Sequence, residues 1–369
     1  MDLLHAFCKT YVSNTLAAGG SQHHFSPSDP KAEQVGRVYY RVFEGGTFTY
    51  SLLFSNTIDS TFADGQHSHQ GYECDNWEIT HLVIGVADHC DERTAGKLHS
   101  VQQITIGGAA SYTVQPGEIF ATDPLTIAAE SGQYLCIEIG FRGNDIPNHE
   151  ESMIPSFVRE GDAWINSRRL PFPSMIGCDR PIKKKIAYLG DSITQGIGVP
   201  FGEYTFWNAL VSERLGHHNA YWNLGLGFGR AMDAAADGTW LAKAKQNDAV
   251  IVCYGVNDLG RGRSAEQILA DLRTILDKLH EVGCRVLLQT VPPFDYSEQV
   301  RVKWETVNRG ILGDLSKHAD AVFDVVPVLG QDAAHPHCAK YGGHPNADGS
   351  CAWADALYPV LADFLGKSH

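Results

Sequence analysis

The sequence predicts two domains, an all-β sandwich followed by an α/β domain with a parallel sheet. The length of 369 residues exceeds the usual size of a single hydrophobic core. From about residue 35 to 140, apolar residues recur with a period of two, as in strands that bury one face. From Lys185 onward, short apolar runs alternate with amphipathic stretches, which is typical of strand–helix units around a parallel sheet.

The composition narrows the class of protein. Apolar residues make up 43% of the chain and charged residues 20%, which is ordinary for a globular protein. The formal net charge of -14 argues against nucleic acid or an anionic membrane as partner, because both require basic patches, and it favours a neutral substrate. No apolar stretch approaches the roughly 20 residues of a membrane span.

The cysteines and the N-terminus predict a cytoplasmic location. The first residues carry no basic start followed by a long apolar segment, so we expect no signal peptide. The nine cysteines are spread widely, and Cys136 and Cys253 fall in apolar runs. We therefore expect buried thiols in a reducing compartment rather than a disulfide framework.

The β-sandwich is expected to span residues 35–145, after an N-terminal arm of residues 1–34. Strand-like runs separated by turns, with no helical stretch between them, favour a sandwich and most simply a jelly roll. Residues 146–182 contain five prolines and are expected to form an irregular linker. The strand-like runs are residues 38–42, 48–54, 79–86, 101–106, 111–114 and 134–139.

The α/β domain is expected to span residues 183–369. Its clearest helix begins at Ser264, where Gln267 three residues later completes a capping box, and Gly283 ends it. Strand–helix alternation implies a parallel sheet flanked by helices, with the functional site at the carboxyl ends of the strands. The predicted strands are residues 186–189, 221–224, 249–254, 285–290 and 321–325.

A serine and a late histidine in this domain carry the chemistry of acyl transfer. Ser192 directly follows the first predicted strand, and His344 precedes the last predicted helix. A serine hydroxyl is a weak nucleophile until a base takes its proton, and His344 is the natural base. The alternatives are that Ser192 only caps the next helix and that His344 is one ordinary histidine among 17.

An acyl-transfer site also needs donors for the oxyanion. The backbone N–H of Ser192, the glycine-rich turn of residues 225–229 and the side-chain amide of Asn257 all follow predicted strands. Glycine lets a backbone approach a substrate closely. The spacing of this turn fits neither a Walker loop nor a dinucleotide fingerprint, so no phosphate cofactor is expected.

These four motifs resemble, in order, the four blocks of the SGNH (GDSL) hydrolases, over residues 183–369. The resemblance implies a flavodoxin-like three-layer domain in which Ser192 is the nucleophile and His344 the base. It also implies that the oxyanion is held by the Ser192 N–H, a glycine N–H and Asn257.

The oxyanion glycine is the first departure from the family pattern. Phe228 stands where the family often has that glycine. A backbone N–H can come from any residue except proline, so only the identity of the donor is open. Gly227 is the first choice and Gly229 the second.

The N-terminal half resembles the β-sandwich found ahead of this domain in bacterial carbohydrate esterases. Residues 53–56, 106–108 and 116–117, followed by residues 122–124, carry this likeness. It implies deacetylation of a sugar, as by an acetyl xylan esterase, with small acetylated xylo- or manno-type oligosaccharides as substrate. The alternatives are a general short-chain acyl esterase or lipase, and a sugar-binding protein without turnover.

The residue that would orient His344 is the second departure. The family's acid normally lies three residues before the histidine, where this chain has Tyr341. Neutralising the triad carboxylate of a serine protease costs about 10⁴-fold in rate. Three interpretations are open: a Ser–His dyad with a backbone carbonyl orienting His344, a carboxylate from elsewhere such as Asp332, or loss of activity.

A metal site is not expected. His335, His337 and Cys338 suggest ligands, as do His67 and His69, but the His-Pro-His spacing places neighbours on a kinked loop without a complete ligand set. The prediction is therefore no metal and no cofactor, and a homo-oligomer is compatible with the sequence. Five tryptophans could stack on sugar rings, although each is more typical of a core: Trp77, Trp207, Trp222, Trp240 and Trp353.

Overall fold

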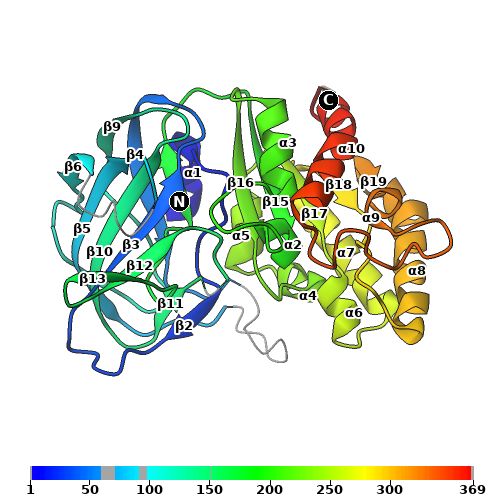
Figure 1. The fold of residues 1–369 in the computed structure, drawn as a ribbon, viewed down its shortest axis with the longest axis horizontal. Helices are drawn as coiled ribbons and strands as arrows, with labels where there is room; N and C mark the ends of the chain where they lie inside the picture. The colour runs from blue at the N-terminus through cyan, green and yellow to red at the C-terminus, as the bar shows by residue number, and fades with distance from the viewer. Residues whose placement is uncertain (1, 60–70, 91–97, 150, 367–369) are drawn as a thin grey trace. The chain divides into compact units, whose positions relative to one another are not determined.

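The computed structural model describes residues 2–59, 71–90, 98–149 and 151–366 (Figure 1). The described residues form two compact units, one ending at Ile182 and the other beginning at Lys183. Unit 1 is mainly β and unit 2 is α/β.

Unit 1 is built on two antiparallel sheets. The first has the order β1-β14-β4-β8, with β9 also paired to β4: β1 (Val12–Ser13), β14 (Met175–Cys178), β4 (Gly46–Ser55), β8 (Ile119–Ala121) and β9 (Leu125–Ala129). The second has the order β13-β12-β3-β10-β5-β6, with β7 also paired to β5: β13 (Ala163–Asn166), β12 (Ser156–Glu160), β3 (Gln34–Arg41), β10 (Tyr134–Gly143), β5 (Trp77–Ala87), β6 (His99–Gln103) and β7 (Tyr112–Val114). The remaining elements are α1 (Leu3–Thr10) and the pair β2 (His23–Phe25) and β11 (Ile146–Asn148).

The expected arm and linker are parts of unit 1 and correct the sequence analysis. Residues 1–34 contain α1, β1 and β2, and residues 146–182 contribute β11 to β14. Two of the prolines mark strand boundaries: Pro155 directly precedes β12, and Pro173 lies two residues before β14. A proline outside a strand removes no ladder hydrogen bond, so these prolines punctuate a sheet instead of marking irregular chain. The jelly-roll topology stays a prediction.

Unit 2 contains a five-stranded parallel sheet with the order β16-β15-β17-β18-β19. In chain order this is 2-1-3-4-5, the arrangement of flavodoxin-like doubly wound folds. Each strand predicted for this domain overlaps one of them. The strands are β15 (Lys184–Gly190), β16 (Asn219–Gly225), β17 (Ala249–Cys253), β18 (Arg285–Gln289) and β19 (Ala321–Phe323).

Helices cover both faces of this sheet. Connections between parallel strands are right-handed, and the strand order reverses after β16. The helix that precedes β16 and the last helix of the chain therefore lie on one face of the sheet, and the helices between them in the sequence lie on the other face. The helices α3 (Trp207–Leu215) and α10 (Ala347–Gly366) contact each other and run side by side in Figure 1. On the other face, α7 (Ala265–His280) contacts both α4 (Ala231–Ala235) and α8 (Glu298–Gly313), while α5 (Thr239–Ala244) contacts β15 and β16.

The helix predicted to begin after Ser264 is confirmed as α7. The Ser264 hydroxyl accepts the Gln267 backbone N–H at 3.3 Å, and the Gln267 side chain accepts the Ser264 N–H at 3.0 Å. Both halves of the capping box are therefore formed. The helix ends at His280, and Gly283 follows in a left-handed conformation with φ 86°.

The carboxyl ends of the first three strands are in register. Gly190 at the end of β15 pairs with Gly225 of β16 and with Cys253 of β17. Both glycines lie directly against the short helix α2 (Ser192–Gln195): a Cβ on Gly225 would lie 2.1 Å from the backbone nitrogen of Gln195. The missing side chains therefore let α2 pack on the strand ends.

The tryptophans belong to the core. All five that could have stacked on sugars are no more than 3% exposed. Trp207 of α3 stacks on Trp353 of α10 with ring centroids 4.6 Å apart, and the Trp353 indole donates to the Gln289 side chain at 2.9 Å. All nine cysteines are free thiols. Over the described part of the chain, every helix is too short or too polar to cross a lipid bilayer.

We predict that Gly225→Ala destabilises the protein by about 3 kcal/mol, because the new methyl group would overlap the backbone of α2. Thermal unfolding should show a melting temperature lower by roughly 6–12 °C. Gly313→Ala is the control, because nothing lies within 4 Å of its Cβ position at the end of α8. A Gly225→Ala variant that melts within about 2 °C of the wild type would contradict the packing of α2.

Candidate active site

Ser192 is placed by a cap at the end of β15. It is the first residue of α2, and the preceding Asp191 is the N-cap, whose carboxylate accepts the Ile193 N–H at 2.9 Å. Asp191 is buried, so this bond fixes the turn between strand and helix. The backbone N–H of Ser192 has no hydrogen-bond partner among the described residues.

The hydroxyl of Ser192 faces the ring of His344. The distance from Ser192 Oγ to His344 Nε2 is 2.8 Å, within reach for proton transfer. Burial lowers the pKa of His344 below its ordinary value. The neutral imidazole is therefore favoured, and only the neutral ring can accept the proton of Ser192. The structure thus brings together the two residues predicted to be nucleophile and base.

The residue predicted as a possible orienting acid for His344 does not contact it. The Asp332 carboxylate accepts the N–H groups of Ala334 at 2.8 Å and His335 at 2.7 Å, and lies 3.1 Å from His335 Nδ1. Asp332 therefore caps its own exposed turn, and its assignment as the orienting acid is wrong for this structure. In the described ranges, Nδ1 of His344 has neither a carboxylate nor a backbone carbonyl as hydrogen-bond partner.

Packing holds His344 instead. The Phe294 ring meets the imidazole nearly edge-on, with centroids 5.4 Å apart and planes at 77°. Gly343 lies against the same ring, since its Cβ would be 2.9 Å from a Phe294 carbon. Gly198, with φ 112°, approaches the backbone of His344 so closely that a Cβ would lie 2.8 Å from its carbonyl oxygen.

Tyr341, at the position of the expected acid, is a packing residue. A Cβ on Gly349 of α10 would lie 2.5 Å from the Tyr341 Cβ. The amine of Lys340 lies 5.0 Å from the centroid of the Tyr341 ring. The Tyr341 carbonyl accepts the Asn346 N–H at 3.1 Å, which closes the loop around His344. Tyr341 therefore fastens this loop to the start of α10.

The glycine-rich turn offers N–H groups beside the serine. The Gly229 N–H donates to the Leu226 carbonyl at 3.1 Å, so the second-choice oxyanion donor is already used within the turn. Gly227 as donor stays a prediction. Phe228 has φ 60°, a left-handed conformation that favours glycine, and its N–H has no partner within the described ranges. Phe228 is thus a further candidate donor, which the sequence analysis passed over because it sought a glycine.

Asn257 is fixed to that turn. It lies in α6 (Val256–Gly260), and its side-chain amide donates to the Gly229 carbonyl at 3.0 Å, leaving its second N–H available. The adjacent Asp258 accepts the Ala231 N–H at 3.0 Å. Burial raises the pKa of Asp258 to about 6, against the opposing effects of that bond and of Arg263. One hydrogen bond therefore ties α6 to the turn, and a second ties it to the start of α4.

The candidate metal ligands do not gather. No group of three or more His, Cys, Asp or Glu side chains in the described part of the chain is arranged to hold a metal ion. His335 is engaged with Asp332. His67 and His69 lie outside the described residues.

A family comparison covers the second unit. The sequence model of the GDSL-like lipase/acylhydrolase family matches residues 188–351, which include Ser192, Asn257 and His344. A comparison with curated proteins found no match.

Solved structures with a similar unit are also found. A lipolytic protein of the G-D-S-L family from Desulfitobacterium hafniense is 20% identical, with 48% of this chain and all of that chain covered and a TM-score of 0.42. A carbohydrate esterase family 3 protein from Talaromyces cellulolyticus is 20% identical, with 50% and 100% covered and a TM-score of 0.39. A family two carbohydrate esterase from Cellvibrio japonicus is 13% identical, with 96% and 97% covered and a TM-score of 0.36.

The lowered pKa of His344 predicts a pH profile. His344 must be neutral to act as base, so kcat/KM for an aryl acetate should fall only as the pH drops through the lowered pKa. The acidic limb should therefore have its midpoint below the ordinary histidine value of 6.5. A midpoint above 6.5 would show that a charged partner stabilises the imidazolium, contrary to the structure.

We further predict that Asp332→Asn leaves kcat/KM within about 2-fold of the wild type, because Asp332 is exposed and does not touch His344.

Phe294→Leu should lower kcat by about 10- to 100-fold with a smaller change in KM, because the ring of His344 loses its edge contact. Phe294→Tyr, which keeps the ring, should restore most of kcat. Steady-state kinetics on an aryl acetate measures kcat and KM of all three variants. A loss of activity by orders of magnitude in Asp332→Asn would show that Asp332 does orient His344.

Proposed function

We propose that this chain removes acetyl groups from oligosaccharides through Ser192, within the segment of residues 188–351 that matches the GDSL-like lipase/acylhydrolase family. The observation that carries the proposal is the 2.8 Å contact between Ser192 Oγ and His344 Nε2, together with the backbone N–H groups of Ser192 and Phe228, which have no partner among the described residues. This arrangement suits nucleophilic attack on an ester carbonyl. The substrates would be small acetylated xylo- or manno-type oligosaccharides.

In the first half-reaction, His344 takes the hydroxyl proton as Ser192 Oγ attacks the acetyl carbonyl. The oxyanion accepts hydrogen bonds from the Ser192 N–H, the free N–H of the Asn257 amide and one N–H of the turn, from Gly227 or Phe228. The intermediate collapses and breaks the bond to the sugar oxygen, which takes the proton from His344 as it leaves. The acetyl group is then bonded to Ser192.

In the second half-reaction, water attacks the acetyl-serine while His344 takes its proton. The same donors stabilise the second oxyanion. Its collapse releases acetic acid and returns the proton from His344 to Ser192 Oγ, so every group ends as it began. No cofactor takes part in this sequence of steps.

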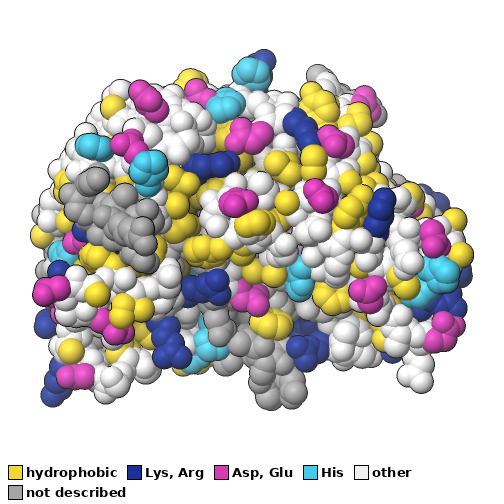
Figure 2. Space-filling view, viewed as in Figure 1, with side chains coloured by type: hydrophobic (Ala, Val, Ile, Leu, Met, Phe, Trp, Pro, Cys, Tyr) yellow, Lys and Arg dark blue, Asp and Glu magenta, His cyan; other side chains and the backbone are white. Residues whose placement is uncertain are grey.

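The sugar substrate is supported by the sequence and the charge. Residues 53–56, 106–108 and 116–117 resemble the β-sandwich of bacterial carbohydrate esterases. The net charge of -14 favours a neutral ligand. On the face shown in Figure 2, Lys and Arg side chains are scattered among Asp and Glu.

The nine free thiols support a reducing compartment such as the cytoplasm.

We predict that Ser192→Ala lowers hydrolysis of aryl acetates by at least about 10³-fold, because the nucleophile is lost. The wild type should also be labelled on Ser192 by a serine-directed phosphonate, as mass spectrometry of the peptides can show. Ser316→Ala is the matched control, since this partly exposed serine bonds, among the described residues, only to the Gly313 carbonyl.

A series of aryl esters from acetate to octanoate separates the remaining functions. The proposal expects the highest kcat/KM with acetate and release of acetate from acetylated xylo- or manno-oligosaccharides. A preference for butyrate or longer chains would indicate a general esterase or lipase instead. If Ser192→Ala changed neither the hydrolysis of an aryl acetate nor the labelling by a serine-directed phosphonate, the chain would instead be a sugar-binding protein without turnover.

A further inference from the structure

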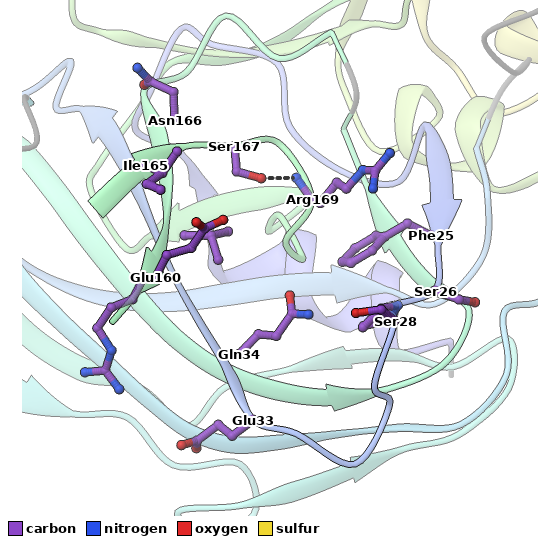
Figure 3. A pocket seen from close by; sticks show the side chains of 13 residues that line it. Phe25, Ser26, Ser28, Glu33, Gln34, Glu160, Ile165, Asn166, Ser167 and Arg169 are labelled. Atoms are coloured by element: carbon purple, nitrogen blue, oxygen red, sulfur yellow. Dashed lines mark hydrogen bonds between the residues drawn. The ribbon is translucent and has the colours of Figure 1, made fainter. Parts of the chain in front are cut away.

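Unit 1 contains a polar groove where β3 and β12 stop pairing. Their ladder ends at Gly36 and Val158. Beyond that point β3 continues against β10 as far as Gln34, and β12 continues against β13 as far as Glu160. Together with residues 25–28, these strand ends line a cavity of about 550 Å³ (Figure 3). This volume is in the range of small-molecule sites.

The groove presents hydrogen-bonding groups that nothing in the protein uses. The side chains of Gln34, Asn166 and Glu160 have no hydrogen-bond partner in the part of the chain that the structure describes. Figure 3 shows Gln34 between Glu160 on one side and Phe25 on the other. An amide offers both donors and acceptors, so Gln34 and Asn166 can bind hydroxyl groups in either direction.

The charge and the apolar part of the lining define the ligand further. Two arginines, Arg159 and Arg169, balance two glutamates, Glu33 and Glu160, so the lining selects for no net charge. Apolar side chains lie among these polar ones: Phe25, Val158 and Ile165, of which Ile165 is 43% exposed. A neutral ligand with hydroxyl groups around its rim and an apolar face fits this combination.

We propose that this groove binds a neutral oligosaccharide and is a second sugar site, in unit 1, whereas Ser192 lies in unit 2. The amides of Gln34 and Asn166 bond to sugar hydroxyls, and Phe25 with Ile165 contacts the C–H faces of the rings. The choice of a sugar over other neutral polar ligands rests on the proposed function. The groove itself rests on the contacts and charges of unit 1.

Isothermal titration of the full chain with unacetylated xylohexaose and mannohexaose tests the proposal, because these probes hold no ester for Ser192. The wild type should bind at least one of them. Gln34→Ala and Asn166→Ala should each raise Kd about 3- to 10-fold, and the double variant more. Asp162→Ala is the control: this residue lies exposed in the turn between β12 and β13 and does not line the groove, so Kd should not change.

The outcomes separate this proposal from the proposed function. Absence of binding by a wild type that hydrolyses aryl acetates overturns the groove alone. So does an unchanged Kd in a double variant that circular dichroism shows to be folded, and so does tighter binding of an anionic oligogalacturonate. Binding that depends on Gln34 in a chain that hydrolyses no ester supports the groove and overturns the esterase.

Discussion

The close packing of α2 on the ends of β15 and β16 is the constraint on which the site depends. At Gly190 and Gly225 the space that a side chain would fill is occupied by Thr194 and by the backbone of Gln195. Because the parallel register ends these strands at the same level, the loops that follow them start side by side. Ser192, the turn of residues 226–229 and α6 are therefore neighbours before any of their side chains interact.

The second requirement is a histidine with a fixed orientation, which packing contacts rather than a carboxylate provide in this structure. A triad carboxylate both orients the imidazole and stabilises its cation. In this protein the contacts of Phe294 with His344 and the tight approach of Gly198 to the loop backbone supply the orientation alone. Burial without a nearby anion then lowers the pKa of His344, so the same packing that holds the ring also keeps it neutral.

Features with a local cause could be predicted from the sequence, and features set by distant contacts could not. The capping box at Ser264 and the strands of unit 2 follow from spacing over a few residues, as does the position of Ser192 after a strand. The partner of Asp332 could not be predicted, because its carboxylate accepts a hydrogen bond from the His335 N–H within its own turn. The role of Phe294 depends on a contact between segments fifty residues apart, which no local pattern encodes.

The absence of a carboxylate bears on the transition state more than on the resting site. When Ser192 donates its proton to Nε2, that nitrogen must be bare, so the tautomer that can act as base carries its proton on Nδ1. The imidazolium formed during attack has no negative partner among the described residues, so solvent that reaches the partly exposed ring must stabilise its charge. A loss confined to the transition state lowers kcat and kcat/KM together and leaves substrate binding intact. Binding of the sugar and orientation of His344 are thus separable properties of this fold.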